Sequence, residues 1–243
     1  MGDCVSTQVN EPVRIVECVP EGSLVVFGNQ YTVKASEKNS GTTDGAITSN
    51  AKKNTLVMKL RPHLLSWSGD SFTVVDVSKG NQELFRVGGK ALTFNQRREV
   101  ADAKTGKAIF HMQENFLQLD DYQTIYRQGK NGDAAEELFR VYSGFGNYQQ
   151  WTEGLKNSNG VPFKLGGKMG IFLKGHIYLD RGQELDSRKA IARVMSPLDW
   201  CDFWPAGWER DSYLVEVAQG VDYALVLAMV LAVDKMMQTY DSD

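Results

Sequence analysis

Residues that could carry acid-base, nucleophilic or metal chemistry are few in this sequence and lie far apart. The three histidines, His63, His111 and His176, do not have the spacing of metal ligands. The sequence has no C-x-x-C pair, no H-E-x-x-H, no G-x-S-x-G and no complete phosphate-binding loop. We therefore expect no catalytic residue, no metal site and no cofactor. An enzyme with a dispersed site stays an alternative, which a cleft of convergent carboxylates or His176 would support.

Two glycine-rich segments resemble the end of a phosphate-binding loop. Gly88-Gly89-Lys90 and Gly166-Gly167-Lys168 both lack the earlier glycine and the following serine or threonine, so we interpret them as turns. Neighbouring acidic residues are interpreted as solvated side chains at turns. These acidic groups are Asp120-Asp121, Glu136-Glu137 and Asp199 with Asp202.

Two groups of residues are candidates for a binding surface. Trp200–Trp208 holds three of the five tryptophans, and such a loop can dip into a membrane interface, grip a partner or plug one end of a barrel. We favour the plug. Arg97 and Arg98, with Lys104 and Lys107, could bind phosphate headgroups, although paired arginines at a hairpin more often face water. No lipid-headgroup residue can be assigned from these patterns.

Composition excludes several classes of protein. The chain has 243 residues, 27 basic and 30 acidic side chains and a net charge of -3, so bulk charge gives no support to nucleic-acid binding. A content of 42% hydrophobic and 23% charged residues is typical of a globular protein and excludes disorder, collagen and coiled coil. Three cysteines and the lack of a secretory signal favour the cytoplasm. Met1–Ser6 fits the myristoylation pattern, but an acidic residue after the glycine disfavours the modification.

Short apolar runs with turn residues between them predict strands along most of the chain. Residues 1–22 are interpreted as a flexible arm, Leu24–Phe27 with Tyr31–Lys34 as a hairpin, and 35–54 as a long loop. No helical stretch separates the later runs, which favours an antiparallel meander. The runs are Thr55–Leu60, Phe72–Val75, Glu83–Val87, Ala108–Met112, Thr124–Arg127, Glu137–Tyr142, Ile171–Lys174, His176–Leu179, Ala190–Val194 and Tyr213–Val217.

A weak repeat supports the meander. Val75–Phe85 and Ala101–Phe110 each contain a strand, an aspartate, a glycine four residues later and a second strand. Asp76 and Asp102 can accept hydrogen bonds from their own turns, and the glycines can adopt positive φ. We interpret both segments as hairpins and not as calcium loops.

Residues 221–237 predict a helix unlike the rest of the chain. Tyr223–Val233 contains no charged residue, so every face of the helix is apolar and must be buried. Asp222 and Asp234 close this run, which is too short to cross a bilayer. The preceding strands are the available cover, so we expect about twelve strands in a closed antiparallel barrel around a central C-terminal helix.

Three segments resemble the LURP-one-related family. They are Tyr213–Ala224 running into the apolar helix and Asp234, Asp76–Val87, and Asp102 with Gly106. The resemblance spans about Thr55 to Met237 and implies the fold of tubby C-terminal domains and phospholipid scramblases. It implies one barrel domain at 23–240, while 35–54 and Asp199–Trp208 diverge from the family pattern.

The resemblance and the lack of catalytic motifs imply a non-enzymatic, monomeric binding module. We expect it to engage phosphoinositide or another anionic membrane lipid through its barrel surface, in the cytoplasm or peripherally at a membrane. The alternative is a protein-interaction or signalling adaptor, related by resemblance to defence or stress, with Trp200–Trp208 as its contact. We expect neither nucleic acid nor metal as a partner.

Overall fold

The computed structural model describes residues 19–20, 22–34, 55–62, 71–89, 97–114, 122–127, 135–144, 149–170, 174–182, 190–195 and 212–240. Several predictions of the preceding section fall outside these residues. They concern Met1–Ser6, residues 1–18 of the arm predicted at 1–22, the loop at 35–54, His63, Asp120-Asp121, Ile171–Leu173, and the Trp200–Trp208 segment with Asp199 and Asp202.

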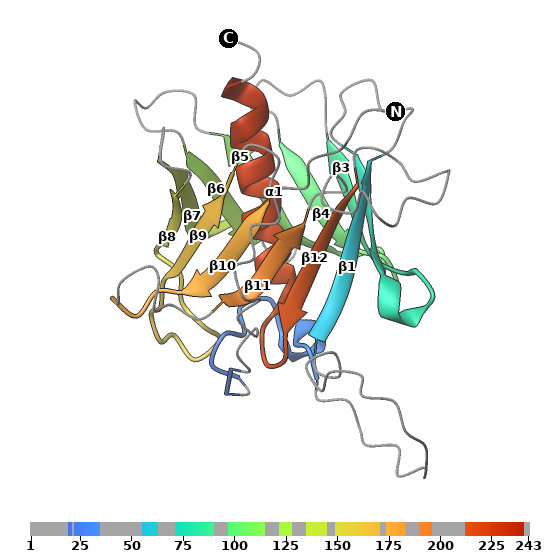
Figure 1. The fold of residues 1–243 in the computed structure, drawn as a ribbon, viewed down its shortest axis with the longest axis horizontal. Helices are drawn as coiled ribbons and strands as arrows, with labels where there is room; N and C mark the ends of the chain where they lie inside the picture. The colour runs from blue at the N-terminus through green and yellow to red at the C-terminus, as the bar shows by residue number, and fades with distance from the viewer. Residues whose placement is uncertain are drawn as a thin grey trace, which may run out of the picture.

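The described elements are mostly short strands, followed in the chain by one helix (Figure 1). The short 3-10 helices are η1 (Asn29–Tyr31) and η3 (Val77–Lys79), and α1 is Tyr223–Tyr240. The strands are β1 (Thr55–Pro62), β2 (Phe72–Asp76), β3 (Gln82–Gly89), β4 (Arg98–Asp102), β5 (Ala108–Glu114), β6 (Tyr122–Arg127), β7 (Glu136–Ser143), β8 (Gln149–Glu153), β9 (Leu165–Met169), β10 (Gly175–Leu179), β11 (Ala190–Met195) and β12 (Tyr213–Ala218).

The strands form a closed antiparallel barrel, as predicted. Each strand pairs with its neighbour in the chain, and β1 pairs with β12 to close the ring. Side chains alternate between the two sides of the wall: in β8, Gln150 and Thr152 are buried while Gln149, Trp151 and Glu153 are exposed. Every described strand edge is therefore paired, and function must be sought on the outer wall or at the two ends.

Helix α1 runs through the centre of the barrel (Figure 1). Its residues from Ala224 to Val233 are almost completely buried, which confirms the central helix predicted at 221–237. The helix begins at Tyr223 because Asp222 caps it: the carboxylate accepts hydrogen bonds from the backbone N–H groups of Ala224 (3.0 Å) and Leu225 (3.3 Å).

One ion pair crosses the interior of the barrel. Arg98 of β4 points inward with 1% of its side chain exposed, and its Nη1 donates to Oδ2 of Asp234 on α1 at 3.0 Å. The guanidinium also lies 5.5 Å from the ring centroid of Phe72 on β2. The pair ties the helix to the wall at the one charged position on α1 that is buried among the described residues.

The hairpin predicted at Leu24–Lys34 is wrong. These residues do not pair with each other but form a strap that bonds the connection between β12 and α1, through bridges from Leu24 to Val221 and from Thr32 to Asp222. The strand propensity is real, but the pairing partner lies almost 200 residues away in the chain. Gly28, at φ 134°, and helix η1 make the strap turn back on itself.

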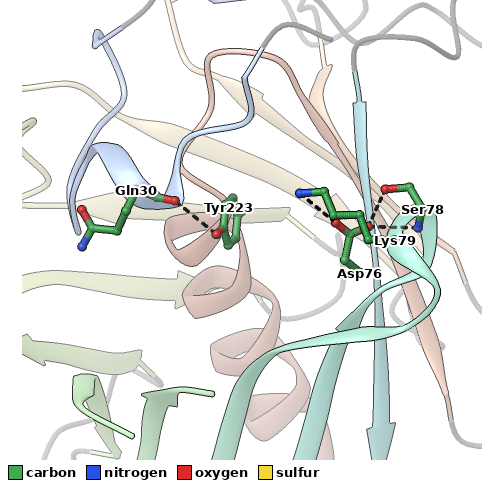
Figure 2. Close-up of polar contacts among 5 residues, drawn as sticks. All are labelled: Gln30, Asp76, Ser78, Lys79 and Tyr223. Atoms are coloured by element: carbon green, nitrogen blue, oxygen red, sulfur yellow. Dashed lines mark hydrogen bonds and ion pairs between the residues drawn. The ribbon is translucent and has the colours of Figure 1, made fainter. Parts of the chain in front are cut away.

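Asp222 fastens this strap to the helix. Its second carboxylate oxygen accepts from the N–H groups of Val26 (2.9 Å) and Phe27 (2.7 Å), so one buried carboxylate holds four backbone donors in two distant segments. Figure 2 shows a further contact at this end, where the Tyr223 hydroxyl donates to the carbonyl of Gln30 at 3.3 Å. The strap therefore covers the end of the barrel where α1 begins.

The two hairpins of the sequence repeat are confirmed. Asp76 accepts from the N–H and hydroxyl of Ser78 and lies 3.7 Å from Lys79 Nζ (Figure 2), and Gly80 has a φ of 66°. Asp102 makes the equivalent bonds to the N–H and hydroxyl of Thr105. Both aspartates are thus occupied by their own turns, as the repeat predicts.

Burial raises the pKa of Asp222 from its ordinary value of 3.8 to about 6, against the effect of its four backbone hydrogen bonds. Between about pH 3.8 and pH 6 the Asp222 carboxyl of the native state therefore keeps a proton that the unfolded chain has released. The contribution of Asp222 to the free energy of unfolding should fall by about 2 kcal/mol as pH rises from 4 to 7. Urea unfolding of the wild type and of Asp222→Asn at each pH measures this contribution. The pH dependence that comes from the other titratable groups is common to both proteins and cancels in the difference. Parallel profiles of the two proteins would contradict the expectation.

Candidate functional site

The structure keeps the predicted histidine candidates apart. His111 lies on the outer side of β5, stacked on Tyr126 at 5.1 Å, and burial together with the charge of Arg97 lowers its pKa to about 4. His176 lies on β10, five strands away around the barrel. Within the described ranges, no three His, Cys, Asp or Glu side chains are placed to hold a metal ion.

The basic group at Arg97, Arg98, Lys104 and Lys107 does not form one surface, so this prediction needs correction. Arg98 is buried against Asp234, whereas Arg97 is on the outside and lies 3.9 Å from Glu99. Lys104 and Lys107 are exposed in the turn at the opposite end of β4. The alternation of a strand separates Arg97 from Arg98, and the length of β4 separates both from the lysines.

A row of basic side chains instead crosses the outer wall of β9, β10 and β11. The register places Lys168 opposite His176, and His176 opposite Arg193. Their inward neighbours Ile177 and Ala192 are fully buried, which fixes these three residues on the outer side. We call Lys168, His176 and Arg193 the basic row.

The position of the basic row follows from the strand geometry. Neighbouring strands lie about 4.8 Å apart, so its outer members are separated by about 10 Å across the wall. Lys168 and Arg193 form no ion pair with another described residue. Glu216 is opposite Arg193 on β12, but its carboxylate accepts from the Thr55 hydroxyl at 3.1 Å. Lys168 and Arg193 therefore offer two positive charges to an anion in solvent, and the Glu216 carboxylate borders the row at its Arg193 end.

Aromatic rings lie on the wall beside the basic row. Tyr122, Tyr142 and Trp151 are opposite one another on β6, β7 and β8, and Trp151 is opposite Gly166 on β9. We call Tyr122, Tyr142 and Trp151 the aromatic row. The rings of Tyr142 and Trp151 are stacked at 5.5 Å with 4° between their planes, and Trp151 is 39% exposed.

Gly166 and Gly167 correct the interpretation of Gly166–Lys168 as a turn, because all three residues lie within β9. A Cβ at Gly166 would collide with the ring of Tyr178, and a Cβ at Gly167 would crowd Gln150 and Met229. The glycines are therefore needed for close packing and not for chain reversal. Gly88 and Gly89 likewise belong to β3.

Sequence reasoning missed both rows because β8 and β9 were not recognised as strands. β9 contains two glycines and a lysine and no β-branched residue, and in β8 the strand-favouring Trp151 and Thr152 are flanked by Gln and Glu. One signal was available: His176 and Arg193 fall on polar positions of two strands that the sequence does predict. Lys168 could join them only once the glycine pair was placed within a strand.

The arrangement suits binding more than catalysis. Basic and aromatic groups lie side by side on the outer wall, and the structure shows no described cleft that converges carboxylates on His176. Such a surface can attract a phosphate-bearing or carboxylate-bearing partner. In the part of the chain that the structure describes, no helix has the length and apolar character needed to cross a bilayer.

Comparisons with known proteins found one family model and a solved structure of low similarity. A family model described as LURP-one-related matches residues 55–234. A crystal structure of a protein from Arabidopsis thaliana matches with 16% identity and a TM-score of 0.48, covering 73% of this chain and 88% of that chain. No curated protein matches the sequence.

Proposed function

The chain belongs to the LURP-one-related family, and from that premise we propose that it is a binding module for anionic membrane lipid, with a phosphoinositide as the preferred class. The family and its barrel fold support a non-enzymatic role. We place the module in the cytoplasm, attached peripherally to a membrane.

The basic row is the observation that carries this proposal. Lys168, His176 and Arg193 are neighbours across three strands, so they can contact one phosphate-bearing headgroup together. Each Lys or Arg near an anionic membrane surface contributes about 1 kcal/mol of attraction. All three residues lie on paired strands of the barrel wall, so their backbones are already fixed before a lipid binds. Less conformational entropy is therefore lost on binding than for residues on a loop.

Reversing two charges of the row tests the proposal. Lys168→Glu with Arg193→Glu should weaken co-sedimentation with vesicles containing phosphatidylinositol bisphosphate by at least about tenfold, because attraction becomes repulsion. Both side chains point outward, so the thermal transition should stay close to that of the wild type. Binding is measured at low and at physiological salt.

Lys104→Glu with Lys107→Glu provides the matched control. It makes the same change of charge in an exposed turn on a distant part of the barrel and should leave binding unchanged. Equal losses in the two double variants would mean that net charge, and not the basic row, governs binding. A wild-type protein that sediments with none of the anionic vesicles at low salt would overturn the proposal.

The adaptor alternative rests on Trp200–Trp208, which lies outside the described residues. A pulled-down partner that Trp204→Ala abolishes, without a change in thermal stability, would favour it over lipid binding.

A further inference from the structure

Trp151 is an exposed aromatic residue that the basic row does not explain. It is one of three large hydrophobic side chains that are exposed in the described part of the chain, with Val77 and Val161. Val77 and Val161 lie in or next to turns, whereas Trp151 lies in the middle of β8, on the wall itself. Its partly exposed indole is therefore available for contact on the outer wall.

The orientation of the indole is fixed by its neighbours. Trp151 stacks on Tyr142, Tyr142 contacts Tyr122 at 5.1 Å, and the Arg140 guanidinium lies 5.2 Å from the Tyr122 ring centroid. Tyr122 is only 3% exposed, so the aromatic row is anchored at one end and exposed at the other. Little conformational freedom would be lost when Trp151 contacts a partner.

The side of Trp151 away from Tyr142 faces β9. The residue opposite Trp151 there is Gly166, which has no side chain, and the ring of Tyr178 lies over that glycine. Lys168, two residues after Gly166, is exposed and belongs to the basic row, and Lys164, two residues before it, is also exposed. The indole is therefore bordered by positive charge on the strand it faces, while the exposed Glu153 lies two residues away on its own strand.

A rigid tryptophan beside lysines is the combination that suits the interface of an anionic bilayer. Indole rings partition to the headgroup level, where an apolar body and a polar N–H are both satisfied, while lysines contact the phosphates above it. Inorganic phosphate would use the lysines alone and would not contact the indole. The pairing of the two features thus favours a membrane surface over a free phosphate compound.

We propose that Trp151 is an interfacial anchor, which inserts into the headgroup layer while the basic row contacts the lipid phosphates. This inference rests on the proposed function and specifies it: the barrel lies with the β8–β11 side against the membrane. Binding then has an electrostatic part that salt weakens and an apolar part that salt does not.

Quenching of tryptophan fluorescence by brominated lipid tests the insertion. The wild type and Trp151→Phe are bound at saturating concentration to anionic vesicles with bromine on the acyl chains near the headgroups. The wild type should lose a component of its emission that Trp151→Phe lacks, since the other four tryptophans are present in both proteins. Equal quenching of the two bound proteins would overturn the inference.

Affinity gives a second measurement. Trp151→Ala should weaken binding about fivefold, and by the same factor at low and at high salt, because partial burial of an indole is not screened. Val77→Ala removes an exposed apolar side chain on the opposite side of the barrel and should leave the affinity unchanged. A Trp151→Ala protein with unchanged affinity would contradict insertion.

The failures of the two proposals are distinguishable. If the charge reversal at Lys168 and Arg193 abolishes binding while Trp151 is neither quenched nor needed, the lipid module stands and the anchor is wrong. If the wild type binds no anionic vesicle, both are wrong. If it binds soluble inositol phosphate as tightly as vesicles, the basic row binds a headgroup without membrane contact and the anchor is again wrong.

Discussion

Val226→Asp is expected to abolish the folded state. Val226 is completely buried on α1, and the helix has no exposed face between Ala224 and Val233 to which the carboxylate could turn. An unpaired carboxylate in such a place either stays charged or takes up a proton, and both cost several kcal/mol. The loss of a packed valine adds to this cost. The total is comparable with the whole stability of a domain, about 5–15 kcal/mol.

Soluble yield and the thermal transition measure this effect, and Val161→Asp is the matched control. Val161 is 56% exposed, so the same substitution there should leave both unchanged. Val226→Ala, which deletes two methyl groups without adding charge, should fold with a lowered melting temperature and keep the effect measurable. A soluble Val226→Asp protein with a cooperative transition would refute the barrel around a buried helix.

Removal of one partner of the Arg98–Asp234 pair should have the second-largest effect. Arg98→Met leaves the Asp234 carboxylate in the interior without its cation, which costs about 3–5 kcal/mol. Replacing both residues, by Arg98→Met with Asp234→Leu, removes the need for compensation, and most of the stability should return. Denaturant unfolding of the wild type, both single variants and the double variant gives the coupling energy.

An exposed pair serves as the comparison. Arg86 and Glu83 form a salt bridge of 2.7 Å on the outer wall, with 66% and 45% of their side chains exposed. Arg86→Met should cost less than about 1 kcal/mol, because water solvates the remaining carboxylate. If Arg98→Met lowered the free energy of unfolding by no more than Arg86→Met does, the prediction of a large effect for the buried pair would be wrong.

The barrel and its helix could be predicted because the apolar C-terminal helix limits how the strands can be arranged around it. Tyr223–Val233 is apolar on all sides, and a helix of that kind requires a complete enclosure, which only the strands could supply. Asp222 was recognised as the residue that closes the apolar run at its start, and in the structure it caps α1. The turn aspartates Asp76 and Asp102 likewise act within a few residues of their own position.

Features that depend on distant partners could not be predicted in this way. Leu24–Lys34 has strand-like residues, but its bonds go to the connection before α1, and pairing across such a distance leaves no local pattern. Arg98 appeared to be a surface residue because its burial depends on Asp234, 136 residues later in the chain. The glycines of β9 were interpreted as a turn because the rings and side chains that require them belong to other strands.

The candidate site was missed for a related reason. Lys168, His176 and Arg193 come from three strands, and they become neighbours only through the register of the sheet. The Trp200–Trp208 segment, which we interpret from the sequence as a plug of one barrel end, with a membrane or partner contact as the alternatives, lies outside the described residues and stays a prediction. A cluster along the chain can be seen in a sequence, whereas a cluster across strands requires the pairing order.

The central position of α1 also determines when this protein can fold during synthesis. The helix that fills the barrel follows every strand in the chain, and β1 must wait for β12 before the ring closes. A ribosome therefore releases all the strands before the element that covers their apolar sides is complete. Contacts of such high sequence separation form slowly, and the emerging strands have exposed edges in the meantime. We expect the barrel to be completed only after α1 has left the ribosome, so the yield of this protein in cells should depend on chaperones that hold nascent β-rich chains.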